Sequence, residues 1–415
     1  MKINNYKKTF LISLGAAFEY YDFIVYALMA HYLIHIFFKG SGLESLIHYL
    51  HTFALGYIVR PLGGILFGLI SDKYGRKSSF LIIIILMSIA TLTMGLLPMN
   101  SSSSLYLLIL ARVVQGIAFG GEVSNAITFV QESNNRDSTH GGILTSAITF
   151  GSIMALFTIY LLTSFLSEKQ IISWGWRVPF LFGGTMVLCC YWVRKDLVET
   201  SEYMKTMSEK KNIPGLLKEL FTKQKLRLAI GLTLSTFVLS LLVVSIFLPT
   251  YFPRFFGYEA KRVSLALTIS LIVSMFISPF VGAVLNKVNK IKFITYVILL
   301  LIPCLWLMFR FLSPALFNIT IFMIIYEIFL SILYIAHLSF LVDLFDVKIR
   351  TTAVGFCYNI GYAIASFLPA FITYLIQVKF SIIFEEDKHM LLWILIGISV
   401  AAFVILKLLC KNYDK

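Results

Sequence analysis

The chain has 415 residues, of which 59% are hydrophobic and only 13% charged, and its formal net charge is +14. Soluble domains carry roughly 25% charged residues, and a water-soluble core could not bury this much apolar surface. The composition therefore excludes an ordinary soluble protein and indicates a membrane protein.

Twelve apolar segments follow one another along the chain. At a rise of ~1.5 Å per residue, about 20 residues match a ~30 Å hydrocarbon slab. We therefore expect an all-α membrane protein with twelve transmembrane helices and little soluble mass. The predicted boundaries are 10–38, 46–70, 79–98, 104–131, 141–166, 174–193, 226–250, 261–284, 291–312, 315–343, 351–378 and 389–410.

The first segment carries two acidic residues, Glu19 and Asp22, and it has no small-residue cleavage site, so no cleavable signal peptide is expected. Their spacing of three places both on one helical face, which Tyr26 continues. Counting from Phe10 puts both carboxyl groups near the middle of the membrane, where an ionised group costs at least ~2.5–3.5 kcal/mol. The proton affinity of such a carboxyl group depends on nearby charge and on solvation, as proton coupling requires.

Four more ionisable residues lie inside apolar segments: Arg60, Arg112, Glu122 and Glu327. Arg112 lies nearer the outer end of its segment, and the other three reach a depth similar to that of Asp22. All four are candidates for handling a solute or a proton. The alternative is that these groups form static ion pairs that only orient helices, and Arg60 and Glu122 could pair permanently in this way.

A gate is predicted in the stretch GLISDKYGRK, Gly68 to Lys77, which joins the second and third segments. Gly68 would let two helices approach closely, Asp72 could accept hydrogen bonds from the start of a neighbouring helix, and Gly75 would turn the chain. Arg76 and Lys77 would then meet lipid headgroups or acidic partners. Such a latch would hold the cytoplasmic side shut in one state and break in the other. The alternative is a plain basic loop.

The spacing of this loop returns 214 residues later, and a second pair of loops repeats with the same offset. Internal repetition in a very apolar chain is typical of transporters built from two related halves, with a site between them near the midplane. Because Asn286 replaces the acid, we expect the second latch to be weaker. The matched pairs are Gly68 with Gly282, Asp72 with Asn286, Lys73 with Lys287, Gly75 with Asn289, Arg76 with Lys290, Arg136 with Arg350 and Gly141 with Gly355.

Lysine and arginine residues give the orientation. If the N-terminus is cytoplasmic, 24 of the 35 lie on that side, so both termini are expected in the cytoplasm of a bacterial cell with the chain in its inner membrane. We expect an N-terminal six-helix bundle at 1–193, a cytoplasmic connector at 194–225 and a C-terminal six-helix bundle at 226–415. The connector holds many of the basic residues, Arg194 included, and its amphipathic part could bind anionic lipid. A nucleic-acid partner is not expected.

Aromatic and amide side chains suggest how a solute could be held. Tyr26 in the first segment and Tyr358 and Asn359 in the eleventh are candidates to line a cavity. Aromatic faces can hold a quaternary ammonium group by cation–π contact, and an amide can bind a carboxylate. With 15% aromatic residues overall, packing against lipid explains most of the rings.

Several stretches resemble known transporter signatures. GLISDKYGRK and ARVVQGIAFGGE (111–122) resemble the loop and helix 4 signatures of the major facilitator superfamily. The chain is similar to its metabolite:proton symporters, which include proline/betaine, shikimate and α-ketoglutarate permeases. This resemblance implies that the helix 1 carboxylates and Arg112 handle substrate or protons, whereas Glu327 matches no motif. Ser201 departs from the family pattern, which usually has Pro there. The further matching stretches are FEYYDFIVY (18–26), RPLGGILFG (60–68), WGWRVPF (174–180), RKDLVETSEY (194–203) and YNIGYA (358–363).

The expected function is proton-coupled uptake of a small polar organic solute, such as a carboxylate, amino acid or betaine, by alternating access. One alternative is an efflux antiporter, but the fifth segment reads TSAITFGSIMALF and lacks the Gly-Pro pair usual there. The other is a sensor on the same scaffold that does not transport. No catalytic residue, metal site or cofactor is expected, and no phosphate-binding loop is present. The expected partners are the solute, protons and membrane lipid, with the chain as a monomer.

Overall fold

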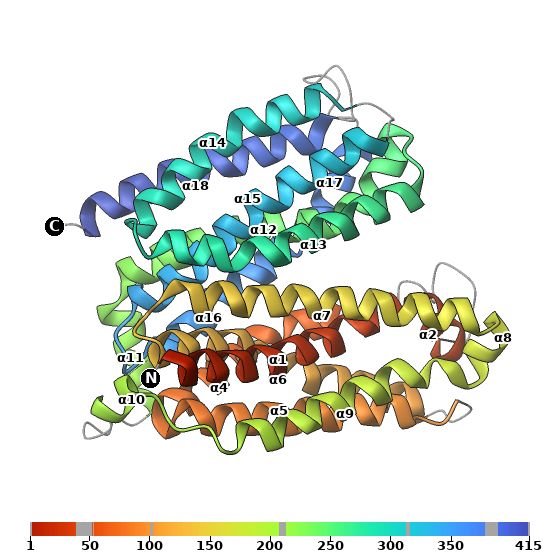
Figure 1. The fold of residues 1–415 in the computed structure, drawn as a ribbon, viewed down its shortest axis with the longest axis horizontal. Coiled ribbons are helices and arrows are strands. Elements are labelled where there is room, and N and C mark those ends of the chain that lie inside the picture. Colours follow the sequence, from red (N-terminus) through yellow and green to blue (C-terminus); the bar gives the residue numbers. More distant parts are fainter. Residues whose placement is uncertain are drawn as a thin grey trace. The chain divides into compact units, whose positions relative to one another are not determined.

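The computed structural model is built of helices over the residues it describes, which are 2–38, 52, 54–99, 103–206, 213–312, 316–377 and 389–413 (Figure 1). Eleven helices in these ranges are long and apolar enough to cross a membrane. The pair Glu168–Gly175 and Arg177–Arg194, bent by 45°, makes a twelfth span when it is counted as one. The predicted all-α architecture with twelve spans is thereby confirmed.

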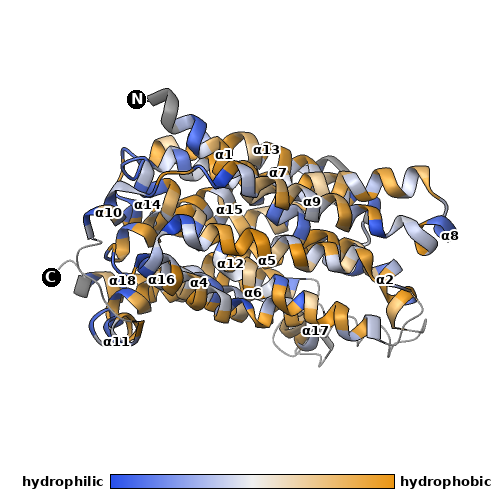
Figure 2. Ribbon diagram, turned by 90° about the horizontal axis from the view of Figure 1, so that it is seen from below, coloured by the Kyte–Doolittle hydropathy of each residue, from blue (hydrophilic) through white to orange (hydrophobic). Residues whose placement is uncertain are grey.

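Figure 2 shows apolar residues along most of the long helices, whereas the short α8 and α10 are mainly hydrophilic. The described helices are α1 (Lys2–Leu28), α2 (Ala30–Phe37), α4 (Arg60–Tyr74), α5 (Arg76–Leu96), α6 (Ser103–Ser133), α7 (Ser138–Phe165), α8 (Glu168–Gln170), the π-helical turn η1 (Ile171–Gly175), α9 (Arg177–Arg194), α10 (Ser201–Thr206), α11 (Ile213–Lys223), α12 (Lys225–Phe256), α13 (Ala260–Leu285), α14 (Lys290–Arg310), α15 (Leu316–Leu344), α16 (Arg350–Ala365), α17 (Leu368–Gln377) and α18 (Met390–Tyr413).

Contacts between Cα atoms divide the chain into two compact units. Unit 1 comprises Met1–Asn135, Ile143–Leu216 and Asp346–Asn359, and unit 2 comprises Arg136–Gly142, Leu217–Phe345 and Ile360–Lys415. The first turns of α7 therefore belong to unit 2, and the first part of α16 belongs to unit 1.

Small residues let the helices of unit 1 pack closely. In this unit α4 packs against α6, α5 against α6 and α9, and α1 against α6 and α9. A Cβ atom on Gly120 of α6 would lie within 3.0 Å of the Arg60 Cα atom, and Gly116 faces the backbone of Gly56. Close backbone approach at small residues is how membrane helices gain packing contacts without help from the hydrophobic effect.

Unit 2 is organised around α12 and α15, which pack against α13, α14 and α18. At one end of these helices the rings of Phe252, Phe309 and Phe322 meet, with Phe322 edge-on to both of the others at centroid distances of 5.2 and 5.3 Å. Edge-to-face packing of this kind adds roughly 0.5–1.5 kcal/mol per pair beyond the buried area. The aromatic cluster therefore fixes three helices of the unit together.

Three predicted segments differ from single straight helices. The segment 10–38 breaks at Met29, between α1 and α2, and 351–378 breaks after Ala365. The second break precedes Pro369, whose ring disfavours a helical conformation at the residue before it. The segment 174–193 begins in the π-helical turn, and part of 46–70 lies outside the described residues. Pro249 lies inside the continuous helix α12.

The close contact between α4 and α6 leads to a stability prediction. Gly120→Val places two methyl groups against the backbone of Arg60, and overpacking of this kind costs typically ~1–3 kcal/mol. We expect the midpoint of thermal unfolding of the purified protein to fall by several degrees. Gly397→Val is the matched control, because nothing lies within 4 Å of a Cβ atom at Gly397. Equal midpoints for the two variants would contradict this account of the packing.

Candidate functional site

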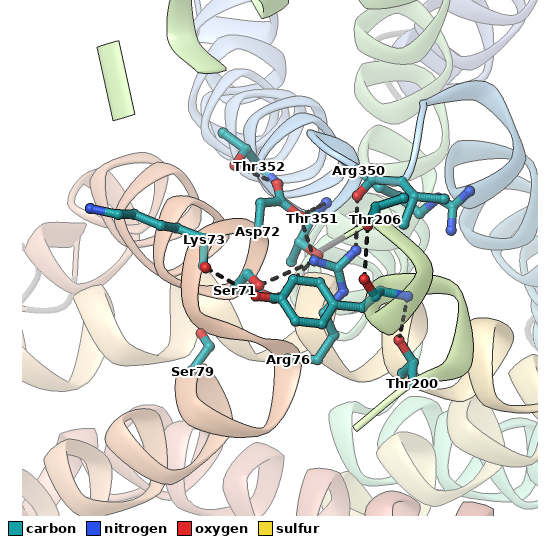
Figure 3. Close-up of polar contacts among 12 residues, drawn as sticks. Ser71, Asp72, Lys73, Arg76, Ser79, Thr200, Thr206, Arg350, Thr351 and Thr352 are labelled. Carbon is teal, nitrogen blue, oxygen red and sulfur yellow. Dashed lines mark hydrogen bonds and ion pairs between the residues drawn. The ribbon is translucent and has the colours of Figure 1, made fainter. Parts of the chain in front are cut away.

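Asp72, near the end of α4, caps the start of α16. Its carboxylate accepts hydrogen bonds from the backbone N–H groups of Thr351 (3.2 Å) and Thr352 (2.8 Å) and from the Thr352 hydroxyl (2.7 Å). Figure 3 shows Asp72 and these two threonines facing one another. A carboxylate at a helix N-terminus satisfies backbone donors that have no partner within the helix, and it also meets the positive end of the helix dipole. The hydrogen bonds predicted for Asp72 are present.

Arg76, at the start of α5, is fully buried and is held by two carboxylates. Its guanidinium lies 2.8 Å from Oδ1 of Asp72 and 2.9 Å from Oε1 of Glu132, at the end of α6. It also donates to the backbone carbonyls of Ser71 (3.1 Å) and Val347 (2.9 Å). Of the two fates predicted for Arg76, the structure shows acidic partners. We call Asp72, Arg76, Glu132 and the first turn of α16 the Asp72 network.

Arg350, the first residue of α16, adds a second guanidinium to this network. Its Nη1 atom lies 2.7 Å from Glu132 and 2.7 Å from Glu202 of α10. The hydroxyl of Thr200 donates to Glu132 at 2.6 Å, and the phenol of Tyr203 donates to the carbonyl of Lys73 at 3.0 Å. Residues 200–203, which follow α9, therefore bind Glu132, Arg350 and the end of α4. The sequence did not predict Arg350, Glu202, Thr200 or Tyr203 as partners of the stretch from Gly68 to Lys77.

Two glycines of the stretch from Gly68 to Lys77 allow a close helix contact and a turn. A Cβ atom on Gly68 would lie 2.5 Å from the Cα atom of Thr352, so only glycine lets α4 approach α16 this closely. Gly75 adopts a φ of 105°, which L residues rarely adopt, and it ends α4 one residue before α5 begins. The backbone N–H of Lys77 donates to Glu199 at 3.2 Å.

Unit 2 repeats the helix-capping arrangement with a neutral residue. The side-chain oxygen of Asn286 accepts from the backbone N–H of Ser138, at the start of α7, at 2.7 Å. Its amide nitrogen donates to Asp137 at 2.5 Å and to Thr139 at 3.1 Å. An acid at position 286 would face the carboxylate of Asp137. The departure from the first copy therefore has a physical reason, which is avoidance of two adjacent like charges.

The pKa of Asp137 reflects these contacts. Partial burial acts to raise the pKa, but hydrogen bonds from Thr139 and Asn286 outweigh it and lower the pKa below the ordinary aspartate value. Because the pKa of Asp137 is lower in the folded protein than in the unfolded chain, its ionised form stabilises the fold. This stabilisation is complete at pH values above the unfolded-state pKa and is lost as the pH falls through the folded-state pKa. Asp343 is another paired carboxylate of unit 2. It lies 2.6 Å from Lys290 and 3.6 Å from Arg136.

Asp22 of α1 lies in a buried network with residues of α5 and α6. Its Oδ2 atom accepts hydrogen bonds from the hydroxyl of Thr91 at 2.5 Å and from the amide of Gln115 at 3.0 Å. The other end of Gln115 accepts from Nη1 of Arg112 at 2.7 Å. Gln115 thus bridges the carboxylate and the guanidinium, so that a change of charge on either is transmitted through one amide.

Arg112 lies between aromatic rings of helix α1. The carbon at the centre of its guanidinium is 4.3 Å from the ring centroid of Phe23 and 4.4 Å from that of Tyr26. A Cβ atom on Gly56 would lie 2.6 Å from Nε of Arg112, so glycine makes room for the guanidinium. A buried arginine held on its faces by rings keeps its planar N–H fork suited to a carboxylate.

Glu19 and Glu122 share one guanidinium, that of Arg194. Nη1 of Arg194 is 3.0 Å from Glu19, and Nη2 is 3.0 Å from Glu122. Arg194, assigned from the sequence to the cytoplasmic connector, is instead the last residue of α9 and is fully buried. The idea that Arg60 pairs with Glu122 is wrong, because the ion pair of Glu122 is formed with Arg194.

Arg60, at the start of α4, lies in an aromatic cage. Its guanidinium carbon is 4.7 Å from the ring centroid of Phe119 and 5.8 Å from that of Tyr358. Its Nε donates to the side-chain oxygen of Asn359 at 3.3 Å, while the amide of Asn359 donates to the carbonyl of Gly120 at 2.7 Å. The candidate residues Arg60, Tyr358 and Asn359 therefore meet in unit 1.

Glu327 lies in unit 2, buried in α15, and accepts a hydrogen bond from the hydroxyl of Ser245 in α12. One turn further along α15, Ser331 donates to the carbonyl of Glu327 at 2.7 Å and lies 2.6 Å from the hydroxyl of Ser274 in α13. Within the described part of the chain Glu327 has no ion pair. Its carboxyl group is thus held by a single hydroxyl among the described residues, that of Ser245.

The residues missed by sequence reasoning differ in how visible they were. Gln115 follows Arg112 by three residues and so shares its helix face, a signal that was available. Thr91 and Arg194 had no such signal, because their partners Asp22 and Glu122 are 69 and 72 residues away. Contacts at this separation depend on how each helix is rotated in the bundle.

Comparison with known proteins agrees with this geometry. The sequence profile of the Major Facilitator Superfamily matches residues 12–370. A protein of Staphylococcus aureus (strain COL) named "Putative proline/betaine transporter" is 33% identical over 299 residues, which are 69% of this chain and 64% of that protein. The chain thus matches just under two thirds of that relative's length. The alpha-ketoglutarate permease of Escherichia coli (strain K12) is 27% identical over 365 residues, 85% of this chain and 83% of that protein.

Solved structures share the fold. The proton:xylose symporter XylE bound to 6-bromo-6-deoxy-D-glucose has a TM-score of 0.77 at 16% identity, covering 96% of this chain and 94% of that chain. The inward open conformation of the xylose transporter XylE from E. coli has a TM-score of 0.65 at 15% identity, covering 97% and 95%. At such low identity the likeness shows a common fold.

The capping residue of unit 2 gives a testable prediction. Asn286→Asp keeps the acceptor for Ser138 but replaces the donor to Asp137 by a second carboxylate, and loss of a hydrogen bond to a charged group costs about 1.5–3 kcal/mol. We expect a lower midpoint of thermal unfolding at neutral pH, with partial recovery as the pH is lowered.

The control lies in the same loop. Asn289 caps α14 by accepting from the backbone N–H of Lys292, and aspartate is an equally good N-cap, so Asn289→Asp should leave the midpoint unchanged. A midpoint for Asn286→Asp equal to that of Asn289→Asp would show that repulsion from Asp137 is not what excludes an acid at position 286.

Proposed function

The chain belongs to the major facilitator superfamily and is a multi-pass membrane transporter, and we propose that it couples the uptake of a small polar organic solute to protons. The observation that carries this proposal is the buried network in which Gln115 bridges Asp22 and Arg112. The distribution of lysine and arginine supports a bacterial inner membrane location with both termini cytoplasmic.

The network supplies a physical basis for symport. Gln115 links the Asp22 carboxyl group to the Arg112 guanidinium, so the charge of one affects the other. A proton on Asp22 weakens the attraction of that carboxyl group for Arg112, and the guanidinium then interacts more favourably with a carboxylate of the solute. Binding of the two together is therefore favoured over binding of either alone.

The solute is expected to carry a carboxylate. Arg112 and Arg60 are two buried guanidinium groups on neighbouring helices, and guanidinium binds carboxylates by two parallel hydrogen bonds. The similarity to relatives named for proline/betaine and for α-ketoglutarate supports the same class. A betaine also needs aromatic faces for its quaternary ammonium group, which cannot donate a hydrogen bond, and the rings of Tyr358 and Phe119 already contact Arg60. We therefore place organic acids and amino acids ahead of betaines.

A thermal-shift screen of the purified protein tests the solute class. A ligand that binds the folded state stabilises it by RT ln(1 + [L]/Kd), so organic acids, amino acids and betaines can be ranked by their effect on unfolding. Net flux of the best ligand into proteoliposomes then separates a transporter from a sensor. An outward flux driven by an inward proton gradient would favour the efflux alternative.

Alternating access requires an element with two states, and the Asp72 network is suited to that role. Its contacts to the start of α16 are polar and are made by the carboxylates of Asp72, Glu132 and Glu202, so they can break without disrupting apolar packing. Glu327 is proposed as a further candidate to bind a proton or solute in unit 2, and Tyr26 as a cavity residue beside Arg112.

The coupling prediction concerns Asp22. Asp22→Asn retains an acceptor for Thr91 or Gln115 but cannot gain or lose a proton. We expect it to abolish accumulation driven by a pH gradient in proteoliposomes while solute exchange at equal pH continues. Glu259→Gln is the control, because Glu259 forms an exposed pair with Arg262. A variant at position 22 that concentrates solute as well as wild type would show that Asp22 is not the coupling site.

The gate prediction concerns Asp72. Asp72→Asn removes one of the two acceptor oxygens that serve α16 and Arg76, so the state in which they are joined loses stability. We expect transport of every solute to slow in proportion, with little change in binding affinity. The measurement is initial uptake of two unlike solutes alongside their binding constants. Altered preference between solutes at full turnover would contradict the role of a gate.

A further inference from the structure

A buried triad of ionisable side chains lies one helical turn from Asp22. It consists of Glu19 of α1, Glu122 of α6 and Arg194 of α9, whose side chains are 2% exposed or less. Arg194 donates to Glu122 through both terminal nitrogens, at 3.0 and 3.4 Å, and to the carbonyl of Ile12 at 3.0 Å.

The helices are shaped to hold this guanidinium. A Cβ atom on Gly15 would lie 2.7 Å from Nε and 2.8 Å from Cζ of Arg194, so only glycine at that position of α1 leaves room. The ring of Phe80 from α5 lies against the guanidinium, with its centroid 4.5 Å from Cζ. Arg194 is therefore fixed in place and cannot turn away to leave the two carboxyl groups unpaired.

The charges of the triad do not balance when both carboxyl groups are ionised. Two carboxylates face one guanidinium, and within the described part of the chain no other cation pairs with either of them. The other titratable groups facing the triad, Asp22 and Cys190, supply no positive charge. An uncompensated charge in an interior without water is strongly disfavoured, so the group neutralises by taking up a proton.

The contacts differ between the two carboxyl groups. Glu122 receives both hydrogen bonds from Arg194. Glu19 lies 3.0 Å from Nη1, yet within the described chain neither of its oxygens accepts a hydrogen bond of normal geometry.

We propose that this triad is a second proton-binding site, separate from Asp22, and that its proton resides on Glu19 while Glu122 and Arg194 form the ion pair. Its part in coupling rests on the proposed function, whereas the presence of the proton does not. Since Glu19 and Asp22 lie on one face of α1, release of this proton adds a negative charge beside Asp22.

Infrared spectroscopy of the protein in lipid tests the proposal without any solute. The carbonyl stretch of a protonated carboxyl group is resolved from that of a carboxylate. At neutral pH, Glu19→Gln should lack one protonated carboxyl group per molecule relative to wild type. Glu122→Gln should also lack it, because Glu19 then ionises to pair with Arg194. Glu168→Gln, at an exposed position, should match wild type.

The outcomes separate cleanly. Loss of the signal in both variants supports a proton bound by the triad, and loss in Glu19→Gln alone places that proton on Glu19. Retention of the full signal in Glu19→Gln overturns the proposal, whatever Glu122→Gln shows, because the proton then lies elsewhere. Failure of proton-coupled uptake would leave this readout unchanged, so the two proposals fail independently.

Discussion

A charged side chain in an apolar interior must find its neutralising partner within the protein, because no water is there to solvate it. Two buried arginines of unit 1 show this constraint clearly. Arg76 lies between Asp72 and Glu132, and Arg194 lies between Glu19 and Glu122. Each arginine is fully buried. Backbone carbonyls accept further hydrogen bonds from both, and Gly15 leaves room for Arg194. Because these ion pairs join different helices, a helix of unit 1 cannot move relative to its neighbours without breaking one of them.

The same constraint explains why the two copies of the loop differ. In unit 1 the residue that caps the neighbouring helix stands beside Arg76, so an aspartate there is compensated. In unit 2 the equivalent residue stands beside Asp137, so an amide, which both accepts from Ser138 and donates to Asp137, satisfies the site without charge. The second copy is thus a different solution to capping a helix, set by the sign of the neighbouring charge. Asn286 adds no charge of its own, so a second latch weaker than the first remains our expectation.

Features that depend on residues close together in the sequence could be predicted, whereas contacts between distant residues could not. The twelve spans follow from length and hydropathy, and the turn at Gly75 and the capping role of Asp72 follow from residue types near helix ends. The pairing of Arg194 could not be read in this way. It lies one residue beyond the predicted end of its segment, and its partners Glu19 and Glu122 belong to helices whose rotation about their own axes is decided by packing at residues such as Gly15. The depth of a residue along its helix can be counted from the sequence. Its partner on a neighbouring helix depends on how the helices pack and rotate.

Proton coupling needs a carboxyl group that can exist in both charge states, and the two buried clusters of unit 1 meet that need differently. Around Asp22 the hydrogen-bond partners are a hydroxyl and an amide, and the amide also accepts from Arg112. Around Glu19 the partner is an arginine already engaged by Glu122, so ionisation requires that this engagement be shared. In our proposals the first cluster interacts with the solute and the second binds a proton. A chain with both can link an external ligand to an internal proton through a single helix, α1, without any direct contact between the two.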